Sequence, residues 1–486
     1  MSSLARQAVR GTLAVGVANA AGGVVSFGGS LYVRGAVRPE EFGIVAFAAS
    51  LLAVSNSVSN WGFSQAAIHR QERADETFAT FLVLRLAMLV GILGVLGLVA
   101  LPFHRFLFQK TDLYVLLALA GAALVDAGCD APSARLARAM EFRRLAAVDV
   151  ASVVAATAAG VVMAAMDFGV WALVANRATQ PVVRAVGLGF ASLETTPLGF
   201  HGEDARWLLR FGLPLWVGSV ATTWVLNYDR LVVSSLSDKE TLGYYDGALW
   251  FALVPLSFVT AVLTRVSFSL YARLQADRER LSEAFRIVSG TTLRLAAPMA
   301  VGMALVIPDF LEVMGWAQWK PMIPVFYCLL VYAMARPLMD DAGGLLTAVG
   351  RPKVTGYTLA AEALALLVLC PALTSRYSAR GAAASVGLVV VGGLAVWYTC
   401  FLPRVVTLSY RRLLLWPLLS VGAGAGASLG VAAWGGLKAG LACGAVKLAT
   451  LAAVYVAVML LLDGRQTAAD LRLLREHIAG RRKTDE

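Results

Sequence analysis

The segment Leu31–Ala46, LYVRGAVRPEEFGIVA, is followed 200 positions later by a related segment, Leu231–Asp246, LVVSSLSDKETLGYYD. Four positions are identical in the two copies: Leu31 and Leu231, Val33 and Val233, Glu40 and Glu240, and Gly43 and Gly243. A shorter identity, LRLA, occurs at 84–87 and again at 293–296, with an offset of 209. One insertion of nine residues in the basic connector near 270–286 reconciles the two offsets. We therefore predict that the chain contains an internal duplication.

The composition predicts a chain that lies in a lipid bilayer. Hydrophobic residues make up 58% of the 486 residues, and the mean hydropathy is +0.70. Soluble domains hold only about 45–50% apolar residues. The apolar runs are long enough to cross the hydrocarbon core of roughly 30 Å, which takes about 20 helical residues. Because the runs are continuous and do not alternate apolar with polar residues, they indicate helices and not barrel strands.

The apolar blocks predict an all-α polytopic membrane protein with about fourteen transmembrane helices. The blocks lie near residues 11–33, 43–66, 79–102, 113–131, 145–166, 168–191, 207–235, 242–264, 287–308, 321–340, 355–374, 381–403, 412–434 and 441–463. Six spans separate the two copies of the repeat, so both copies face the same way across the membrane. We expect two six-helix lobes related by an axis along the membrane normal, followed by two additional helices.

The domain organisation follows from this count. We predict an N-lobe at 1–191, a cytoplasmic linker at 192–206, a C-lobe at 207–403, helices 13 and 14 at 404–463, and a basic cytoplasmic tail at 464–486. A duplicated membrane protein usually forms its pathway between the two halves. Transport is therefore the first function that the repeat predicts.

The distribution of charge gives the orientation. With the N-terminus inside the cell, the loops and tail on the cytoplasmic side carry more than twice as many Lys and Arg residues as the outer loops. This excess agrees with the positive-inside rule and places both termini in the cytoplasm. The formal net charge of +11 is therefore expected to contact anionic membrane lipids, and we do not expect nucleic-acid binding.

Sequence motifs for catalysis are missing. The five cysteines lie in apolar spans without the spacing of metal ligands, and the four histidines lie in loops or in the tail. No zinc-protease motif, serine-hydrolase elbow or phosphate-binding loop ending in Lys-Ser or Lys-Thr occurs. We predict no enzyme activity, no catalytic residue, no metal and no cofactor, with energy taken from an ion gradient, a membrane potential or the substrate gradient.

Ionisable residues at membrane depth are costly to bury and are the candidates for function. The cations in the predicted spans are Arg85, Arg177, Arg184, Arg230, Arg294 and Arg336. The acids are Asp126, Asp130, Asp149, Asp229, Asp246, Asp340, Asp341 and Glu362. Those near a helix end have a second interpretation, since long side chains there reach the interface or pair across helices.

From this set we select candidate site residues. The predicted cationic, substrate-binding cavity comprises Arg177, Arg184, Arg85, Arg294 and Arg336. Arg177 is favoured because it lies near the middle of its helix, before Pro181, which loosens the helix locally. Glu362 and Asp149 are the candidates for coupling to H⁺ or Na⁺. Asp229 and Arg230 are predicted to form a structural ion pair.

Three segments resemble the Wzx-type oligosaccharide flippases. RPEEFGIVA at 38–46 resembles the "Gly-Pro-Glu-Glu-Phe-Gly" turn between the first two helices of that family, with Arg38 in place of the first glycine. GFSQAAI at 62–68 is similar to the family's "Gly-Leu-Ser-Gln-Ala-Leu-Ile". Asp-Arg-Leu at 229–231, followed by Leu-Gly-Tyr-Tyr at 242–245, resembles its second-half signature.

The resemblance implies a member of the multidrug/oligosaccharidyl-lipid/polysaccharide exporter superfamily in the bacterial inner membrane. Such a protein moves an undecaprenyl-pyrophosphate-linked oligosaccharide from the cytoplasmic to the periplasmic leaflet by alternating access. Arginine suits this cargo, because its planar donors meet phosphate oxygens bidentately and it stays charged when buried. The expected partners are the lipid-linked oligosaccharide, anionic membrane lipids and other polysaccharide-assembly proteins.

Two alternatives stay open at this point. The nearer is another branch of the superfamily, a lipid II flippase or a multidrug cation antiporter. The more distant is a membrane enzyme of polysaccharide assembly, such as a polymerase or an acyltransferase. The short outer loops and the missing membrane-depth histidines disfavour the enzyme.

Overall fold

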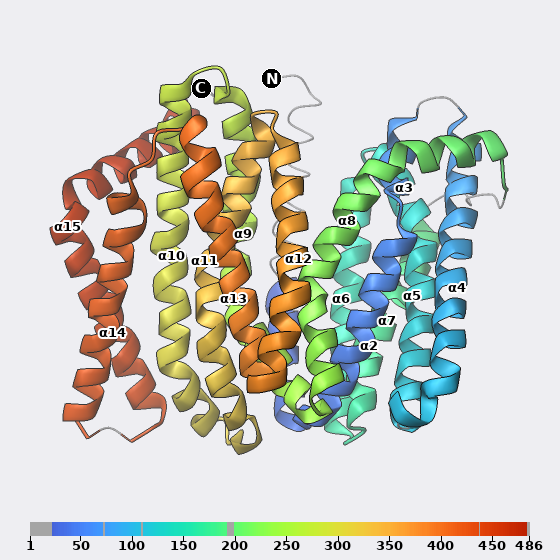
Figure 1. Cartoon of the computed structure of the whole chain (residues 1–486), viewed down its shortest axis with the longest axis horizontal. Helices are drawn as coiled ribbons and strands as arrows, with labels where there is room; N and C mark the ends of the chain where they lie inside the picture. The colour runs from blue at the N-terminus through green and yellow to red at the C-terminus, as the bar shows by residue number, and fades with distance from the viewer. Residues whose placement is uncertain (1–21, 71–72, 108–109, 192–198, 437, 484–486) are drawn as a thin grey trace. The chain divides into compact units, whose positions relative to one another are not determined.

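The structure is a computed structural model that describes residues 22–70, 73–107, 110–191, 199–436 and 438–483. These residues are almost entirely helical and contain no strand (Figure 1). In the part that is described, the fourteen predicted spans fall on helices, with a break at residues 60–62 inside the span predicted at 43–66. This confirms the all-α polytopic class. Residues 1–21, much of the predicted linker (192–198) and the last three residues of the predicted tail lie outside the described residues.

The chain divides into two compact units, Met1–Gly243 and Tyr244–Glu486, and the division falls inside α9. Unit 1 contains a helix over residues 22–36, then α2 (Pro39–Ser59), α3 (Phe63–His69), α4 (Ala74–Leu107), α5 (Lys110–Arg138), α6 (Phe142–Ala165), α7 (Val170–Ala191) and α8 (Gly202–Leu236). Unit 2 contains most of α9 (Lys239–Leu274), then α10 (Arg278–Val313), α11 (Ile323–Ala348), α12 (Pro352–Tyr377), α13 (Ala379–Val396), α14 (Trp416–Trp434) and α15 (Leu441–Lys483). The lobe boundaries drawn from the repeat stay a prediction.

Nine segments of the described residues are long and apolar enough to cross a membrane. One of them, Pro39–His69, includes both α2 and α3, and another, Pro352–Arg404, includes both α12 and α13. The helices α7, α8 and α9 are not among the nine. In α7, Arg177 and Arg184 lower the mean hydropathy of a helix of 22 residues.

The repeated turn begins α2 by local rules. Pro39 occupies the first helical position, where its fixed φ favours the helix and its missing N–H costs nothing. Glu41, in the first turn, accepts a hydrogen bond from the Arg38 backbone N–H at 3.0 Å. Its other oxygen accepts from the Val170 N–H at 3.1 Å. One carboxylate therefore satisfies the open N–H groups at the starts of both α2 and α7.

The two glycines of the repeat lie against each other's helix. A Cβ on Gly43 would overlap with the carbonyl oxygen of Lys239 at the start of α9, and a Cβ on Gly243 would overlap with the carbonyl oxygen of Pro39 at the start of α2. The Lys239 ammonium also lies 3.9 Å from the ring centre of Phe47. The equivalence that the repeat predicts for Gly43 and Gly243 is thus reproduced as a reciprocal backbone contact within unit 1.

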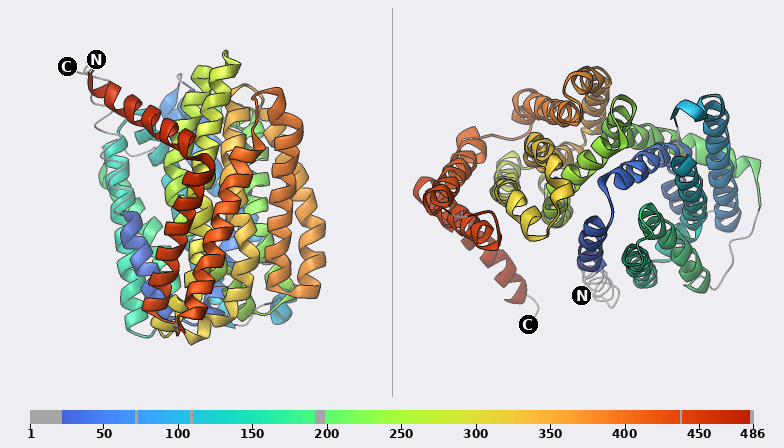
Figure 2. Two further views of the ribbon diagram at one scale, coloured as in Figure 1. Left: turned by 90° about the vertical axis from the view of Figure 1, so that its left-hand side faces the viewer. Right: turned by 90° about the horizontal axis from the view of Figure 1, so that it is seen from below.

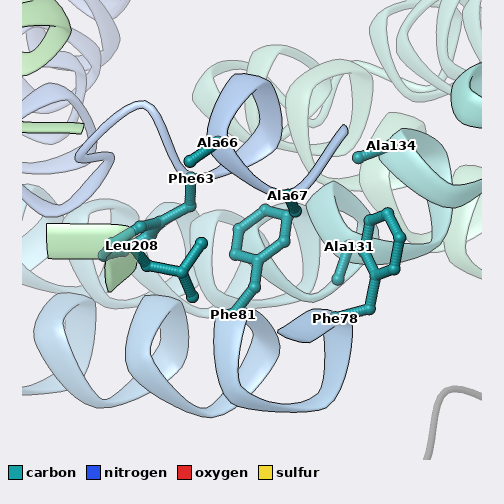
Figure 3. Packing of buried hydrophobic residues seen from close by; sticks show 8 residues of the cluster. All are labelled: Phe63, Ala66, Ala67, Phe78, Phe81, Ala131, Ala134 and Leu208. Carbon is teal, nitrogen blue, oxygen red and sulfur yellow. The ribbon is translucent and has the colours of Figure 1, made fainter. Parts of the chain in front are cut away.

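A small aromatic core joins four helices at one end of unit 1 (Figure 3). Phe63 from α3 packs against Phe81 from α4, with ring centres 5.7 Å apart. Leu208 of α8 and Ala131 of α5 close the cluster. All four side chains are fully buried. This packing fixes the short helix α3, which is too short to be stable without tertiary contacts.

In unit 2, the hairpin of α14 and α15 packs along α10 (Figure 2). Lys447 of α15 extends its ammonium to Asp309 of α10, with Nζ 2.7 Å from Oδ2. The other oxygen of Asp309 accepts from the Gly440 N–H at 3.2 Å. Asp309 is 2% exposed, so its charge depends on these contacts. The ion pair fastens the two additional helices to the repeat.

We expect Lys447→Met to lower the stability of unit 2 by about 1–3 kcal/mol, because the buried Asp309 carboxylate loses its cation. The measurement is the melting temperature of the purified protein in detergent. The control is Lys438→Met, which removes an exposed lysine from the turn before α15. The double variant Asp309→Asn/Lys447→Met should recover part of the loss. Equal melting temperatures for the two lysine variants would contradict the prediction.

Candidate functional site

Arg85 lies at the junction of three helices in unit 1 and is 1% exposed. Its Nε donates to Asp130 of α5 at 2.8 Å. Its two terminal nitrogens donate to the side chains of Ser59 and Asn56 near the end of α2. A guanidinium buried to this degree is stable only with its donors satisfied and its charge paired. The structure thus gives Arg85 partners from α2 and α5, and its predicted contact with a substrate stays a prediction.

Arg184 of α7 contacts two further acids, one on α5 and one on α6. Its Nε is 3.1 Å from Oδ1 of Asp149 on α6, and one terminal nitrogen donates to Asp126 of α5 at 3.3 Å. The other terminal nitrogen donates to Ser133 at 3.3 Å. The Asp126 and Asp149 side chains are 44% and 42% exposed, against 24% for Arg184. Two predicted site residues, Arg184 and Asp149, are therefore in direct contact and remain accessible.

We call these five charged residues of α4, α5, α6 and α7 the N-unit charge cluster: Arg85, Asp126, Asp130, Asp149 and Arg184. The cluster holds three carboxylates against two guanidinium groups, so it is not a purely cationic surface. Sequence reasoning selected Arg85, Arg184 and Asp149 but assigned no role to their partners Asp126 and Asp130. No signal in the sequence pairs residues on different helices. The only indication of a role for Asp126 and Asp130 was their position inside a predicted span.

Unit 2 contains a related arrangement on α11 and α12. The Nε of Arg336 is 3.0 Å from Oδ1 of Asp340, one helical turn later. Glu362 of α12 lies within electrostatic range of both groups and is 4% exposed. Its Oε1 has no hydrogen-bond partner among the described residues and faces Gly393 of α13, where a Cβ would displace it. The two predicted residues Arg336 and Glu362 are thus brought together, and the spacing of four residues could have identified Asp340.

A second buried acid in unit 2 was not selected from sequence. Asp341, 3% exposed, accepts hydrogen bonds from Tyr271 of α9 at 2.9 Å and from Ser289 of α10. Three helices therefore meet at this carboxylate. Its neighbour Asp340 contacts Arg336, so these two adjacent acids of α11 have different partners.

Four of the predicted residues remain, and they are Arg177, Arg294, Asp229 and Arg230. Arg177 is exposed on α7, and Arg294 is half-buried on α10, where its carbonyl accepts from the Tyr455 hydroxyl at 2.9 Å. Asp229 is 3% exposed and accepts from the backbone N–H of Arg230, whose guanidinium donates to the Leu226 carbonyl at 3.1 Å. The predicted roles of these four residues stay predictions.

An apolar groove of about 480 Å³ lies beside the buried arginine, between α2, α4 and α8. Its wall includes Met88, one helical turn from Arg85, and the stacked pair Trp61 and Trp216, whose ring centres are 4.5 Å apart. The Trp216 indole N–H donates to the Val58 carbonyl at 2.8 Å, which fixes the ring. The wall of this groove is apolar almost throughout.

The chain belongs to a known family. Residues 36–324 match the family model described as "Polysaccharide biosynthesis protein". The succinoglycan biosynthesis transport protein ExoT of Rhizobium meliloti is 27% identical over 290 residues, 60% of this chain and 58% of that protein. The lipopolysaccharide biosynthesis protein WzxC of Escherichia coli is 23% identical over 318 residues, 65% of this chain and 64% of that protein. The matches therefore span less than two thirds of the lengths of these relatives.

The fold has a known counterpart. The lipid II flippase MurJ in its inward closed conformation superimposes with a TM-score of 0.73 over 92% of this chain and 98% of that protein, at 13% sequence identity. This likeness shows the fold alone. Together with the family match, it agrees with a multi-pass membrane protein of the polysaccharide biosynthesis family, as the resemblance to the Wzx-type proteins implies.

Proposed function

We propose that the protein flips a lipid-linked oligosaccharide, carried on undecaprenyl pyrophosphate, from the cytoplasmic to the periplasmic leaflet. The observation that carries the proposal is the contact of Arg184 with two partly exposed aspartates at membrane depth, in a chain of the polysaccharide biosynthesis family. The relatives named as transport and lipopolysaccharide biosynthesis proteins support the same function. The protein would act by transport and not by catalysis.

In this proposal, Arg184 exchanges partners during the cycle. The pyrophosphate presents oxygens that match the planar donors of a guanidinium better than two separate carboxylates do. Protonation of Asp149 or Asp126 would weaken their hold on Arg184 and release it for the phosphate. Proton uptake and substrate binding would therefore favour each other at one arginine, which is a positive coupling between two ligands. Arg177, two turns earlier on α7, would extend the cationic surface.

The second unit would contribute a matching exchange. Arg336 is held by Asp340, while Glu362 is buried without a hydrogen-bond partner for Oε1 among the described residues. A buried carboxylate of this kind is costly unless it is protonated or ion-bound. We assign to Glu362 the binding of H⁺ or Na⁺ and to Arg336 the contact with the anionic cargo. Arg85 and Arg294 complete the set of proposed cationic residues.

We further propose that the protein lies in the bacterial inner membrane with both termini in the cytoplasm. The excess of Lys and Arg in the loops on that side supports this orientation. These residues would contact anionic lipid head groups. Other proteins of polysaccharide assembly are proposed as partners that supply and consume the flipped unit.

The test uses a strain that lacks the gene. We expect complete lipid-linked oligosaccharides to accumulate on the cytoplasmic face, and the wild-type gene to relieve the accumulation. Arg184→Ala should lower the flipping rate at least tenfold, which corresponds to a rise of about 1.4 kcal/mol or more in the activation free energy of flipping. Arg184→Lys should recover little of the rate, because lysine lacks the planar donors. The measurement is the fraction of lipid-linked units accessible to a glycosidase in inside-out and right-side-out vesicles.

The control is Arg143→Ala, which removes an exposed arginine at the start of α6. Arg177→Ala is tested beside it, and full rescue by that variant would remove Arg177 from the site. Full rescue by Arg184→Ala would discard the exchange at Arg184 while leaving the flippase. Complete units on the periplasmic face would indicate a polymerase or a later enzyme. Accumulation of lipid II would indicate a lipid II flippase, and no accumulation would indicate drug export.

A further inference from the structure

Three potential metal ligands meet where α8 begins beside α4, away from the charge clusters. Glu76 lies in the first turn of α4, His201 directly precedes α8, and Asp204 lies in the first turn of α8. One ligand atom from each of the three side chains lies within 4.8 Å of the other two. The sequence does not connect these residues as one site, because Glu76 and His201 lie 125 positions apart.

Asp204 and His201 each have a buried side-chain atom left without a hydrogen-bond partner among the described residues. Asp204 is fully buried, and its Oδ1 is 2.7 Å from a terminal nitrogen of Arg70. Its Oδ2 has no hydrogen-bond partner among the described residues, and neither does the buried Nδ1 of His201. A buried carboxylate oxygen and a buried imidazole nitrogen normally have partners, so this pair calls for a bound group. With the imidazole proton on Nε2, both atoms would offer a lone pair to a cation.

The surrounding contacts orient the ligands and leave these atoms free. The His201 backbone N–H donates to the Thr80 hydroxyl at 3.1 Å, which fixes the start of α8 on α4. The Arg73 Nε lies 2.5 Å from Glu76, and a terminal nitrogen of Arg73 lies 2.9 Å from Glu203. Groups that contact a ligating carboxylate position it for a metal, and Arg73 makes such a contact with Glu76.

The local charge accommodates a dication. Three carboxylates, those of Glu76, Glu203 and Asp204, face the two guanidinium groups of Arg70 and Arg73. The imidazole adds a nitrogen ligand, which suits Zn²⁺ and similar transition metals and not Mg²⁺ or Ca²⁺. Zn²⁺ commonly binds one or more histidines with carboxylates in a tetrahedral site.

We propose that Glu76, His201 and Asp204 bind a divalent transition metal ion of the Zn²⁺ class, with water as the fourth ligand. The ion would fasten the first turn of α4 to the first turn of α8, directly after the segment that leads from α7 into α8. The site shares no residue with the proposed flipping site, so the metal proposal can be tested independently of the proposed function. It also departs from the sequence analysis, which predicts no metal.

The test measures Zn²⁺ binding to the full-length protein in detergent by isothermal titration calorimetry, after chelator treatment and without a polyhistidine tag. We expect one Zn²⁺ per chain. His201→Gln and Asp204→Asn should each weaken binding at least tenfold. His69→Gln is the matched control, since it removes another histidine at the same end of unit 1 and should leave the affinity unchanged. Equal losses for His69→Gln and His201→Gln, or no binding by the wild type, would overturn the proposal.

An X-ray absorption spectrum of the zinc-loaded wild type makes the test independent of the folding of the variants. We expect a first shell of nitrogen and oxygen at about 2.0–2.2 Å. A sulfur shell at about 2.3 Å would place the ion on a cysteine and refute the assignment. Zn²⁺ should also raise the melting temperature of the wild type but not of His201→Gln, because an ion that binds only the folded state stabilises it.

Discussion

Arg85→Leu is expected to destabilise unit 1 by about 3–5 kcal/mol, the cost of removing one partner from a buried charged pair. The variant leaves Asp130 without its cation and removes the donors that reach Asn56 and Ser59 on α2. Leucine also fails to fill the volume of a side chain that is 1% exposed. At about 2–4 °C per kcal/mol for a unit of this size, the melting temperature should fall by roughly 6–20 °C.

The measurement is the melting temperature in detergent, followed by tryptophan fluorescence. Arg143→Leu serves as the control, because that arginine is exposed at the start of α6. Arg85→Lys should recover less than half of the loss, since one ammonium cannot reach three groups in the plane of the guanidinium. The double variant Arg85→Leu/Asp130→Leu should be more stable than the sum of the single effects. Strict additivity would mean that the pair is not coupled.

Sequence reasoning identified the helices of this fold well because hydrophobic length is a one-dimensional property. The block 145–166 is long and apolar enough to predict a span by itself, and the structure has α6 at Phe142–Ala165. The unusual composition of α7 was also readable, since Arg177 and Arg184 are visible in the sequence. The positions of those arginines along the helix follow from counting residues.

The partners of the charged residues could not be predicted in the same way. Arg184 meets Asp126 and Asp149 because α5, α6 and α7 pack side by side, and helix rotation decides which side chains meet. The sequence therefore indicated a cationic cavity, whereas the structure pairs Arg184 with acids. One pair that lies within a single helix, Arg336 and Asp340, has the spacing of four that sequence analysis can use.

The repeat gives the strongest link between sequence and packing. Identity at Gly43 and Gly243 indicates only that glycine is present in both copies. The structure supplies the physical reason, since each glycine lies against a carbonyl oxygen at the start of the other helix. Two helices that approach this closely leave no space for a side chain, and glycine is the residue that permits such an approach.

Gly43→Ala and Gly243→Ala should therefore each destabilise the protein by about 4 kcal/mol or more, above the usual cost of overpacking of about 1–3 kcal/mol. The added Cβ would meet backbone, which cannot rotate away as a flexible side chain does, so α2 and the start of α9 must separate. In other helical positions the same substitution has the opposite sign, because alanine favours a helix by about 1 kcal/mol over glycine.

Gly94→Ala on α4 is the matched control, since no atom lies within 4 Å of the position of its Cβ. We expect this variant to melt at the wild-type temperature or slightly above it, while both repeat variants give little folded protein in size-exclusion chromatography. If Gly43→Ala and Gly94→Ala behave alike, the close approach of the two repeated turns is wrong. If only Gly43→Ala is damaging, the contact is not reciprocal, and the structural equivalence of the two copies fails at this turn.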